Sequence, residues 1–206
     1  MNLKLVFAFA LIGAQLASPK KVVDEAKAKQ KDIWKAMSRS DVFFLLRRTY
    51  RWSGDRCRCV YMRILERNET SHTFFALSGK YNQSQPVYTR HPAFVTARKE
   101  KKGSSQMVFS PVGYDGAGIT YELLFDDGKN CSVLRITNVT VEFPPTVKIG
   151  GCELWATQES ARYINVESPC EVKYFKLCNP STNIEDTPYE VSCLDPPKSA
   201  ESLPIC

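Results

Sequence analysis

Eight short runs rich in β-branched and aromatic residues follow one another along the chain, and they constrain the fold more than any other feature of the sequence. Turn residues separate most of these runs. One such turn segment is Asp126-Asp127-Gly128-Lys129, which favours a tight hairpin. Consecutive strands joined by short turns predict an up-and-down antiparallel barrel or a sandwich. The runs are 42–52, 57–67, 72–80, 86–98, 106–112, 119–125, 131–143 and 151–157.

Helical signals flank these runs on both sides. From Lys21 to Met37, apolar residues recur at mostly helical spacing, which predicts an amphipathic helix. Ser168-Pro169-Cys170-Glu171 combines an N-cap serine, a proline at the first helical position and a glutamate placed for a capping box, so we expect a second helix from about Pro169 to Cys178. The proline-rich tail at residues 188–206 indicates an extended strap, and no linker interrupts a single domain at residues 19–206.

The first 18 residues read as a secretory signal peptide. A basic start is followed by an apolar run from Leu5 to Ala17, which is too short to span a membrane. We therefore expect a secreted, extracellular protein, and sequons at Asn68, Asn82 and Asn138 are typical of one. All eight cysteines follow this segment, and their even number predicts four disulfides: Cys57, Cys59, Cys131, Cys152, Cys170, Cys178, Cys193 and Cys206.

Several functional classes find no support in the sequence. The net charge of +6 is mild, and the basic run at residues 98–102 has no interleaved aromatic residues, so we expect no nucleic-acid partner. No second apolar run reaches the length of a membrane span. His72 and His91 lack metal-ligand spacing, and neither a nucleophile elbow nor a phosphate loop is present. We therefore expect no enzyme, no cofactor and no metal site.

The pair Glu153 and Trp155 is the first candidate binding feature. The two residues lie two apart in a predicted strand, so their side chains share one face. Facing into a barrel, they would offer a carboxylate and an aromatic plane to an organic cation. Facing outward, they would be a solvated glutamate and a rim tryptophan, and spacing alone does not decide between the two arrangements. An eight-stranded barrel has room for one small ligand.

In two further runs, the sequence leaves open which side chains point into the barrel. Glu122 and Leu124 share one face of residues 121–125, and Tyr121, Leu123 and Phe125 share the other, where bulk favours an inward position. Tyr50 and Trp52 share a face near the end of the first predicted strand, where the pattern favours packing at the barrel end over ligand binding.

Six short segments together resemble the tick histamine-binding proteins and the wider family of tick salivary lipocalins. They are Asp32-Ile33-Trp34-Lys35, Thr49-Tyr50, Cys59-Val60, the hairpin from Asp126 to Cys131, Cys152-Glu153-Leu154-Trp155 and Val191-Ser192-Cys193-Leu194. The resemblance extends over essentially the whole chain after the signal peptide. It implies a mainly β fold, an eight-stranded antiparallel lipocalin barrel with an N-terminal helix and a C-terminal helix packed outside. It also implies a monomer that binds and sequesters a small host molecule.

The resemblance also implies disulfides and ligand-binding residues. Its pairs are Cys59–Cys193, Cys131–Cys170, Cys152–Cys178 and Cys57–Cys206, although Cys57 and Cys59 could exchange roles. Tyr50, Glu153 and Trp155 match positions of the family's amine sites, and Glu122 matches a further acid. Trp52, from the strand pattern, and Phe109, from the apolar strand residues, complete the candidate ligand-binding set without support from the resemblance. Ser53 and Ser132 stand where histamine binders carry acids, which argues against two full amine sites.

We therefore expect a biogenic amine such as histamine as the ligand. One alternative is a lipid mediator in an apolar pocket lined by Phe43, Leu45, Phe109, Leu123 and Phe125. Another is inhibition of a host protein by the outer surface of the barrel.

Overall fold

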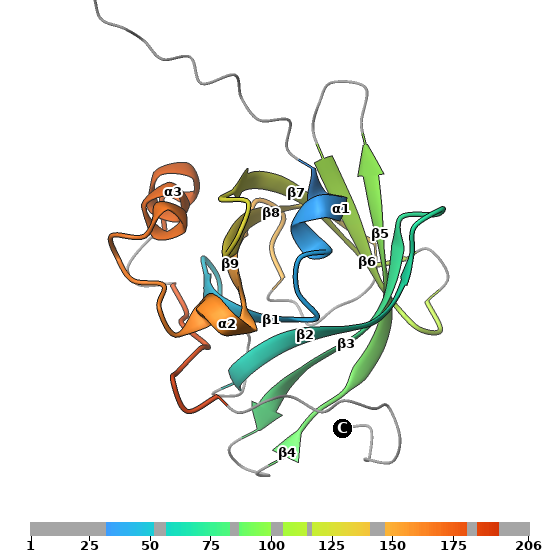
Figure 1. The fold of residues 1–206 in the computed structure, drawn as a ribbon, viewed down its shortest axis with the longest axis horizontal. Coiled ribbons are helices and arrows are strands. Elements are labelled where there is room, and N and C mark those ends of the chain that lie inside the picture. The colour runs from blue at the N-terminus through green and yellow to red at the C-terminus, as the bar shows by residue number, and fades with distance from the viewer. Residues whose placement is uncertain are drawn as a thin grey trace, which may run out of the picture.

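Nine antiparallel strands form one sheet in the computed structural model, which describes residues 32–51, 57–82, 87–99, 105–114, 117–140, 147–180 and 185–193. The strand order is β2-β1-β9-β8-β7-β6-β5-β3-β4, and a further pairing of β2 with β3 closes it into the expected eight-stranded barrel (Figure 1). The strands are β1 (Val42–Arg48), β2 (Cys57–Asn68), β3 (Thr73–Asn82), β4 (Val87–Tyr88), β5 (His91–Lys99), β6 (Ser105–Pro111), β7 (Ile119–Asp126), β8 (Cys131–Val139) and β9 (Cys152–Thr157).

The fourth predicted run is divided between two strands. Among the described residues, β4 pairs with the end of β3 alone. Thr89 follows β4, and its backbone N–H donates to the Lys80 carbonyl at 2.8 Å. The carbonyl oxygen of Thr89 lies so close to Gly79 that a Cβ at that position would be 2.0 Å from it. Only glycine allows this close approach. The pairing makes β4 an extension of the sheet at the end of β3, and β4 is not a ninth strand of the closed barrel.

Alternation along the strands separates an inner cluster from an outer one. The inner cluster includes Phe43, Tyr121, Leu123 and Leu134 inside the barrel, whereas the outer cluster includes Phe44, Leu46, Leu154 and Tyr174. Irregular pairing between Leu45 and Arg47, and between Leu123 and Phe125, interrupts this alternation. Because a bulge inserts one extra residue, the side chains beyond it change face.

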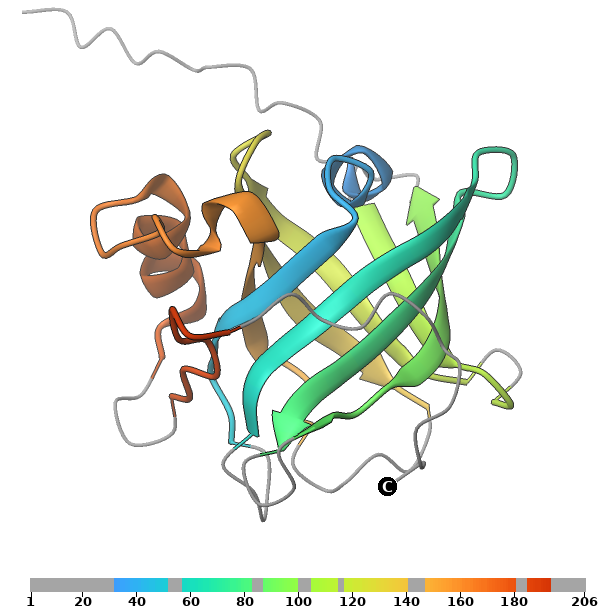
Figure 2. The same cartoon turned by 60° about the horizontal axis from the view of Figure 1, so that its bottom comes forward.

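Helix α1 (Ile33–Met37) lies across one end of the barrel (Figure 2). The ring of Trp34 stacks on Phe74 with a centroid distance of 4.1 Å, and the Ile33 N–H donates to Ser105 Oγ at 2.7 Å. Asp32 caps the helix by accepting a hydrogen bond from the Lys35 N–H. The earlier part of the helix predicted from Lys21 lies outside the described residues.

Two further helices follow β9. Helix α2 (Gln158–Ala161) is short, and α3 (Pro169–Cys178) packs outside the barrel against β7, β8 and β9. The bounds of α3 agree with the sequence prediction, but the predicted capping box is wrong. Ser168 makes no side-chain capping bond, and Glu171 instead accepts a hydrogen bond from Arg47 Nε on β1 at 2.7 Å.

Three disulfides join cysteine pairs that the resemblance implies. Cys131–Cys170 and Cys152–Cys178 fasten both ends of α3 to β8 and β9, and Cys59–Cys193 ties the C-terminal segment to β2. This segment, residues 185–193, also exchanges two backbone hydrogen bonds between Asp186 and Arg48. Pro188, at the start of the predicted strap, accepts a backbone hydrogen bond from Cys59 at 2.7 Å, so part of the strap lies beside the barrel wall. The proposed Cys57–Cys206 bridge and the predicted signal peptide lie outside the described part of the chain. Within the described part, no helix has the length and apolar character needed to cross a membrane.

The structure describes the side chains at two of the three predicted glycosylation sites. The side chains of Asn68 and Asn138 are both exposed on the barrel surface, where a glycan would meet no obstruction from burial. The side chain of Asn82 lies outside the described part of the chain. Attachment of sugars at all three positions stays a prediction.

Candidate functional site

A buried carboxylate, that of Glu153 on β9, is the centre of the candidate site. Its neighbours Cys152 and Leu154 pack in the outer cluster, so alternation directs Glu153 to the barrel interior, where it is only 3% exposed. The carboxylate accepts hydrogen bonds from Trp155 Nε1 at 2.7 Å, from the hydroxyl of Tyr50 and from the hydroxyl of Tyr121 at 3.4 Å. Residues from β7, β9 and the end of β1 thus converge on one acid.

Burial determines the acid–base properties of this cluster. It raises the pKa of Glu153, and the hydrogen bonds from Tyr50 and Trp155 and the positive charge of Arg48 offset that rise only in part. Burial and the neighbouring carboxylate hold the pKa values of Tyr50 and Tyr121 well above their usual value. Both phenols therefore stay protonated at neutral pH and act as hydrogen-bond donors.

The candidate residues Trp155 and Phe109 both belong to the interior. Trp155 is paired with Leu45 on β1 and Ser132 on β8, and both aromatic side chains pack against the inner cluster. The interior therefore contains aromatic side chains, and the buried Arg48 is a charged neighbour of Glu153. Tyr50, Glu153 and Trp155 come together as the resemblance implies, whereas Trp52 lies outside the described residues.

Glu122 does not lie with this group. In β7 it pairs with Arg135 of β8 and Gln106 of β6, and its side chain faces away from the interior that Tyr121 and Leu123 enter. The sequence could place Glu122 and Tyr121 on opposite faces but not decide which face is inside. The pairing register decides it, and it makes Tyr121, not Glu122, the β7 residue of the site.

Phe125 was expected to line the interior and does not. The irregular pairing between Leu123 and Phe125 moves the Phe125 ring to the outer cluster, where Lys173 Nζ of α3 lies 5.7 Å from its centroid. Leu123, before the bulge, remains inside. A bulge adds a residue without a strong sequence signal here, so simple alternation assigned Phe125 to the wrong face.

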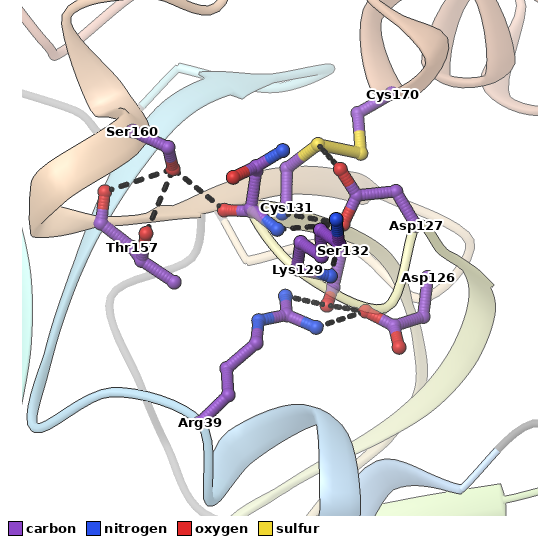
Figure 3. The surroundings of a disulfide bond; sticks show 10 residues. Arg39, Asp126, Asp127, Lys129, Cys131, Ser132, Thr157, Ser160 and Cys170 are labelled. Atoms are coloured by element: carbon purple, nitrogen blue, oxygen red, sulfur yellow. Dashed lines mark hydrogen bonds and ion pairs between the residues drawn. A yellow bond between two sulfur atoms is a disulfide. The ribbon is translucent and has the colours of Figure 1, made fainter.

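A second polar cluster lies near α1, toward the barrel end that this helix covers (Figure 3). The Arg39 guanidinium donates to the Asp126 carboxylate and to Ser132 Oγ, the latter at 2.7 Å, and Ser132 Oγ also donates to Asp126 at 3.0 Å. Sequence reasoning noted Ser132 but missed Arg39, which follows α1 and lies more than 80 residues away from both partners in the chain. The acid at this end therefore already has a cationic partner.

Asp127, next to this cluster, is a structural residue. Burial raises its pKa, but three backbone N–H donors of the hairpin, those of Lys129, Asn130 and Cys131, outweigh burial and lower it overall. The side chains of Asp127, Cys131 and Cys170 lie close enough to hold a metal ion. Because the two cysteines form a disulfide, this group offers no thiolate ligand.

A surface pocket of about 280 Å³ lies outside the barrel. Residues of the β7–β8 hairpin, α2 and the start of α3 line it, among them Asp127, Glu159 and Ser168. It shares no residue with the group around Glu153 and contributes nothing to that group.

The chain matches a known protein family in sequence and a solved structure in fold. A family model described as tick histamine binding protein matches residues 22–195. The chain is similar to the structure of Japanin from Rhipicephalus appendiculatus bound to cholesterol, with 14% identity, a TM-score of 0.51, and 75% of this chain and 95% of that chain covered. At this identity the similarity shows the fold alone.

Two other solved structures are also similar. A biogenic amine-binding protein has 11% identity and a TM-score of 0.46, with 67% of this chain and 72% of that chain covered. The allergen Per a 4 from cockroaches has 14% identity and a TM-score of 0.49, with 78% and 89% covered. No curated protein sequence matches this chain.

Proposed function

The chain belongs to the tick histamine-binding protein family, and from this premise we propose that it is a secreted protein that sequesters a biogenic amine, such as histamine, inside its barrel. Binding is stoichiometric and without turnover, and its effect is to remove a host mediator of inflammation or defence. The disulfides support an extracellular location, because such bonds persist in oxidising compartments.

The observation that carries this proposal is the inward carboxylate of Glu153. An ionised carboxylate has about four acceptor positions, and three side-chain donors occupy three of them. An ammonium or imidazolium group has only donors to offer and is complementary to the remaining position. In a low-dielectric interior the negative charge of Glu153 attracts such a cation strongly.

The aromatic neighbours support the same ligand class. Tyr121 and Trp155 contribute aromatic rings beside the carboxylate, and a desolvated cation over such a ring gains about 2 kcal/mol. These groups also donate hydrogen bonds to Glu153, which stabilise its charged form. The site thus combines a counter-ion with an apolar enclosure, as binding of a small aromatic amine requires.

The test is calorimetric titration of the disulfide-intact protein with histamine and serotonin. We expect Glu153→Gln to weaken amine binding by about 100-fold, because loss of one partner of a buried charge pair costs about 2–5 kcal/mol. Glu122→Gln is the matched control, since it removes the same charge from the outer face of the barrel, and we expect it to leave the affinity unchanged. Equal affinity of the Glu153→Gln variant and the wild type would refute the proposal.

A lipid mediator is the second candidate, and the apolar interior favours it. Phe43, Leu123 and Phe109 belong to or pack against the inner cluster and would contact an acyl chain or a sterol ring system. The same titration with leukotrienes and long-chain fatty acids separates the two ligands. Lipid binding that Glu153→Gln leaves intact, without amine binding, would favour this second function.

A further inference from the structure

Two consecutive arginines of β1 pair with two consecutive acids of the C-terminal segment. Arg47 Nη1 lies 3.1 Å from Glu185 Oε1, and Arg48 Nε donates to Asp186 Oδ2 at 2.8 Å. Backbone hydrogen bonds of 2.9 and 3.0 Å between Arg48 and Asp186 hold the second pair in register. The ion pairs differ, however, in the face of the barrel wall from which each arginine comes.

Only Arg48 lies on the face of the candidate site. The register between β1 and β9 pairs Arg48 with Glu153 and Arg47 with Leu154, so Arg48 shares the inner face and Arg47 the outer one. The Arg48 guanidinium lies 5.5 Å from the ring centroid of Tyr50, whose hydroxyl donates to Glu153. Arg48 is thus a buried cation, only 3% exposed, next to the carboxylate proposed to bind a cationic ligand.

This arrangement sets two carboxylates in competition for one guanidinium. A buried charge without a partner costs several kcal/mol, so Arg48 needs an acid wherever it lies. If it paired with Glu153, it would neutralise the site and occupy the position of a ligand ammonium. In the structure Asp186 is an ion-pair partner of Arg48, and the three hydrogen bonds to Glu153 described above come from uncharged donors.

We propose that Asp186 is a positioning residue for ligand selectivity: by pairing with Arg48, it leaves the charge of Glu153 for a cationic ligand. The inference rests on the proposed amine-binding function and deepens it. The C-terminal segment, which Cys193 fastens to β2, thereby controls the charge of a site inside the barrel. Asp186 acts only through Arg48 and does not contact the ligand.

Asp186→Asn tests this inference directly. The backbone bonds to Arg48 remain available, but the counter-ion is lost, and Arg48 turns to Glu153. We expect the affinity for histamine to fall by about tenfold or more, the effect of a competing buried charge pair worth about 1.5 kcal/mol. Glu185→Gln is the matched control, because it removes the neighbouring acid, which pairs with Arg47 on the outer face, and we expect it to leave the affinity unchanged.

The double variant Arg48→Gln/Asp186→Asn distinguishes positioning from a general structural role. With the guanidinium gone, Glu153 is again available, so we expect amine affinity to recover to near the wild-type value. Arg48→Gln alone should bind amines at least as tightly as the wild type. Weak binding by either folded variant would overturn the inference, as would wild-type affinity in Asp186→Asn.

A second measurement separates this inference from the proposed function. Carbon-13 NMR titration of labelled glutamate reports the pKa of Glu153 without any ligand, in the presence of its neighbours Tyr50, Tyr121 and Arg48. In Asp186→Asn, closer approach of Arg48 should lower that pKa. A lowered pKa in a protein that binds no amine would refute the proposed function but support the Arg48–Asp186 coupling. An unchanged pKa would refute the coupling, whatever the protein binds.

Discussion

At the scale of single residues, Glu153 shows how burial creates a function out of an ordinary acid. A carboxylate taken out of water must be hydrogen-bonded, and Tyr50, Tyr121 and Trp155 meet that need with donors that carry no charge. These hydrogen bonds stabilise the charge of Glu153 without neutralising it. Burial of such a carboxylate lowers the stability of the fold, and the same carboxylate can bind a cationic ligand.

The destabilising effect of the buried Glu153 carboxylate should be measurable in the pH dependence of the unfolding free energy. Because burial raises the pKa of Glu153 above its ordinary 4.5, the folded chain takes up this proton more readily than the unfolded chain. The contribution of Glu153 to stability is thus fully present below the ordinary value and is lost as the pH rises through the raised one. We expect the unfolding free energy of the wild type, relative to Glu153→Gln, to decrease between about pH 4 and about pH 7.

Urea unfolding of the wild type and Glu153→Gln at both pH values measures this difference, and the other acids cancel because both proteins carry them. A relative stability that increased with pH would contradict the prediction. Amine binding should follow the opposite trend. It should weaken as the pH falls through the raised pKa, because a protonated carboxyl group is no counter-ion.

At the scale of elements, α3 depends on its cross-links and on the wall beneath it. It has only ten residues, too few for a stable isolated helix, and its side chains Glu171 and Tyr174 are buried against the barrel. Glu171 accepts its hydrogen bond from Arg47, whose guanidinium also lies 5.3 Å from the Phe175 centroid. Tertiary contacts therefore hold the helix, which ends at the left-handed C-cap Asn179 and receives no side-chain capping bond from Ser168 at its N-terminus.

Removal of the Cys152–Cys178 bridge tests this dependence. We expect Cys152→Ala/Cys178→Ala to lower the unfolding free energy by about 3–4 kcal/mol, since the bridge closes a loop with a sequence separation of 26. Amine affinity should be unchanged, because the disulfide lies on the outer wall and Glu153 on the inner one. Urea unfolding and calorimetric titration measure the two effects, and loss of affinity in a folded variant would show that α3 does shape the site.

At the scale of the whole molecule, the barrel has two polar clusters with different charge states. The Glu153 cluster has uncharged donors, whereas at the cluster near α1 Arg39 already pairs with Asp126 and hydrogen-bonds Ser132. An additional cation near α1 would have to displace a guanidinium that is tied to the chain. The described part of the barrel thus offers one carboxylate suited to a cationic ligand.

We therefore expect one equivalent of amine to bind per chain. Calorimetry with histamine should give a single transition with a stoichiometry of one, and Glu153→Gln should remove it. Two equivalents of comparable affinity, or binding that responds to substitution of Asp126 and not of Glu153, would contradict this expectation.

Prediction from the sequence succeeded where it depended on near neighbours. The two-residue period identified the strands and placed Glu153 and Trp155 on one face, and the start signals at Ser168-Pro169 located α3. It failed for Phe125, because a bulge changes the face without an obvious signal. It also failed for the role of Glu171, because Arg47, its partner, lies 124 residues away.

The sequence by itself thus determined the eight strands of the barrel and the C-terminal helix, because these follow from periods and caps within a few residues, but not the division of residues 86–98 between β4 and β5. Only the tertiary structure decided that Glu153 faces inward and Glu122 outward, that Tyr50 and Tyr121 donate to Glu153, and that Asp186 holds Arg48. These contacts join residues 103, 32 and 138 positions apart. They depend on the register in which the strands pair when the barrel closes, which no local period specifies.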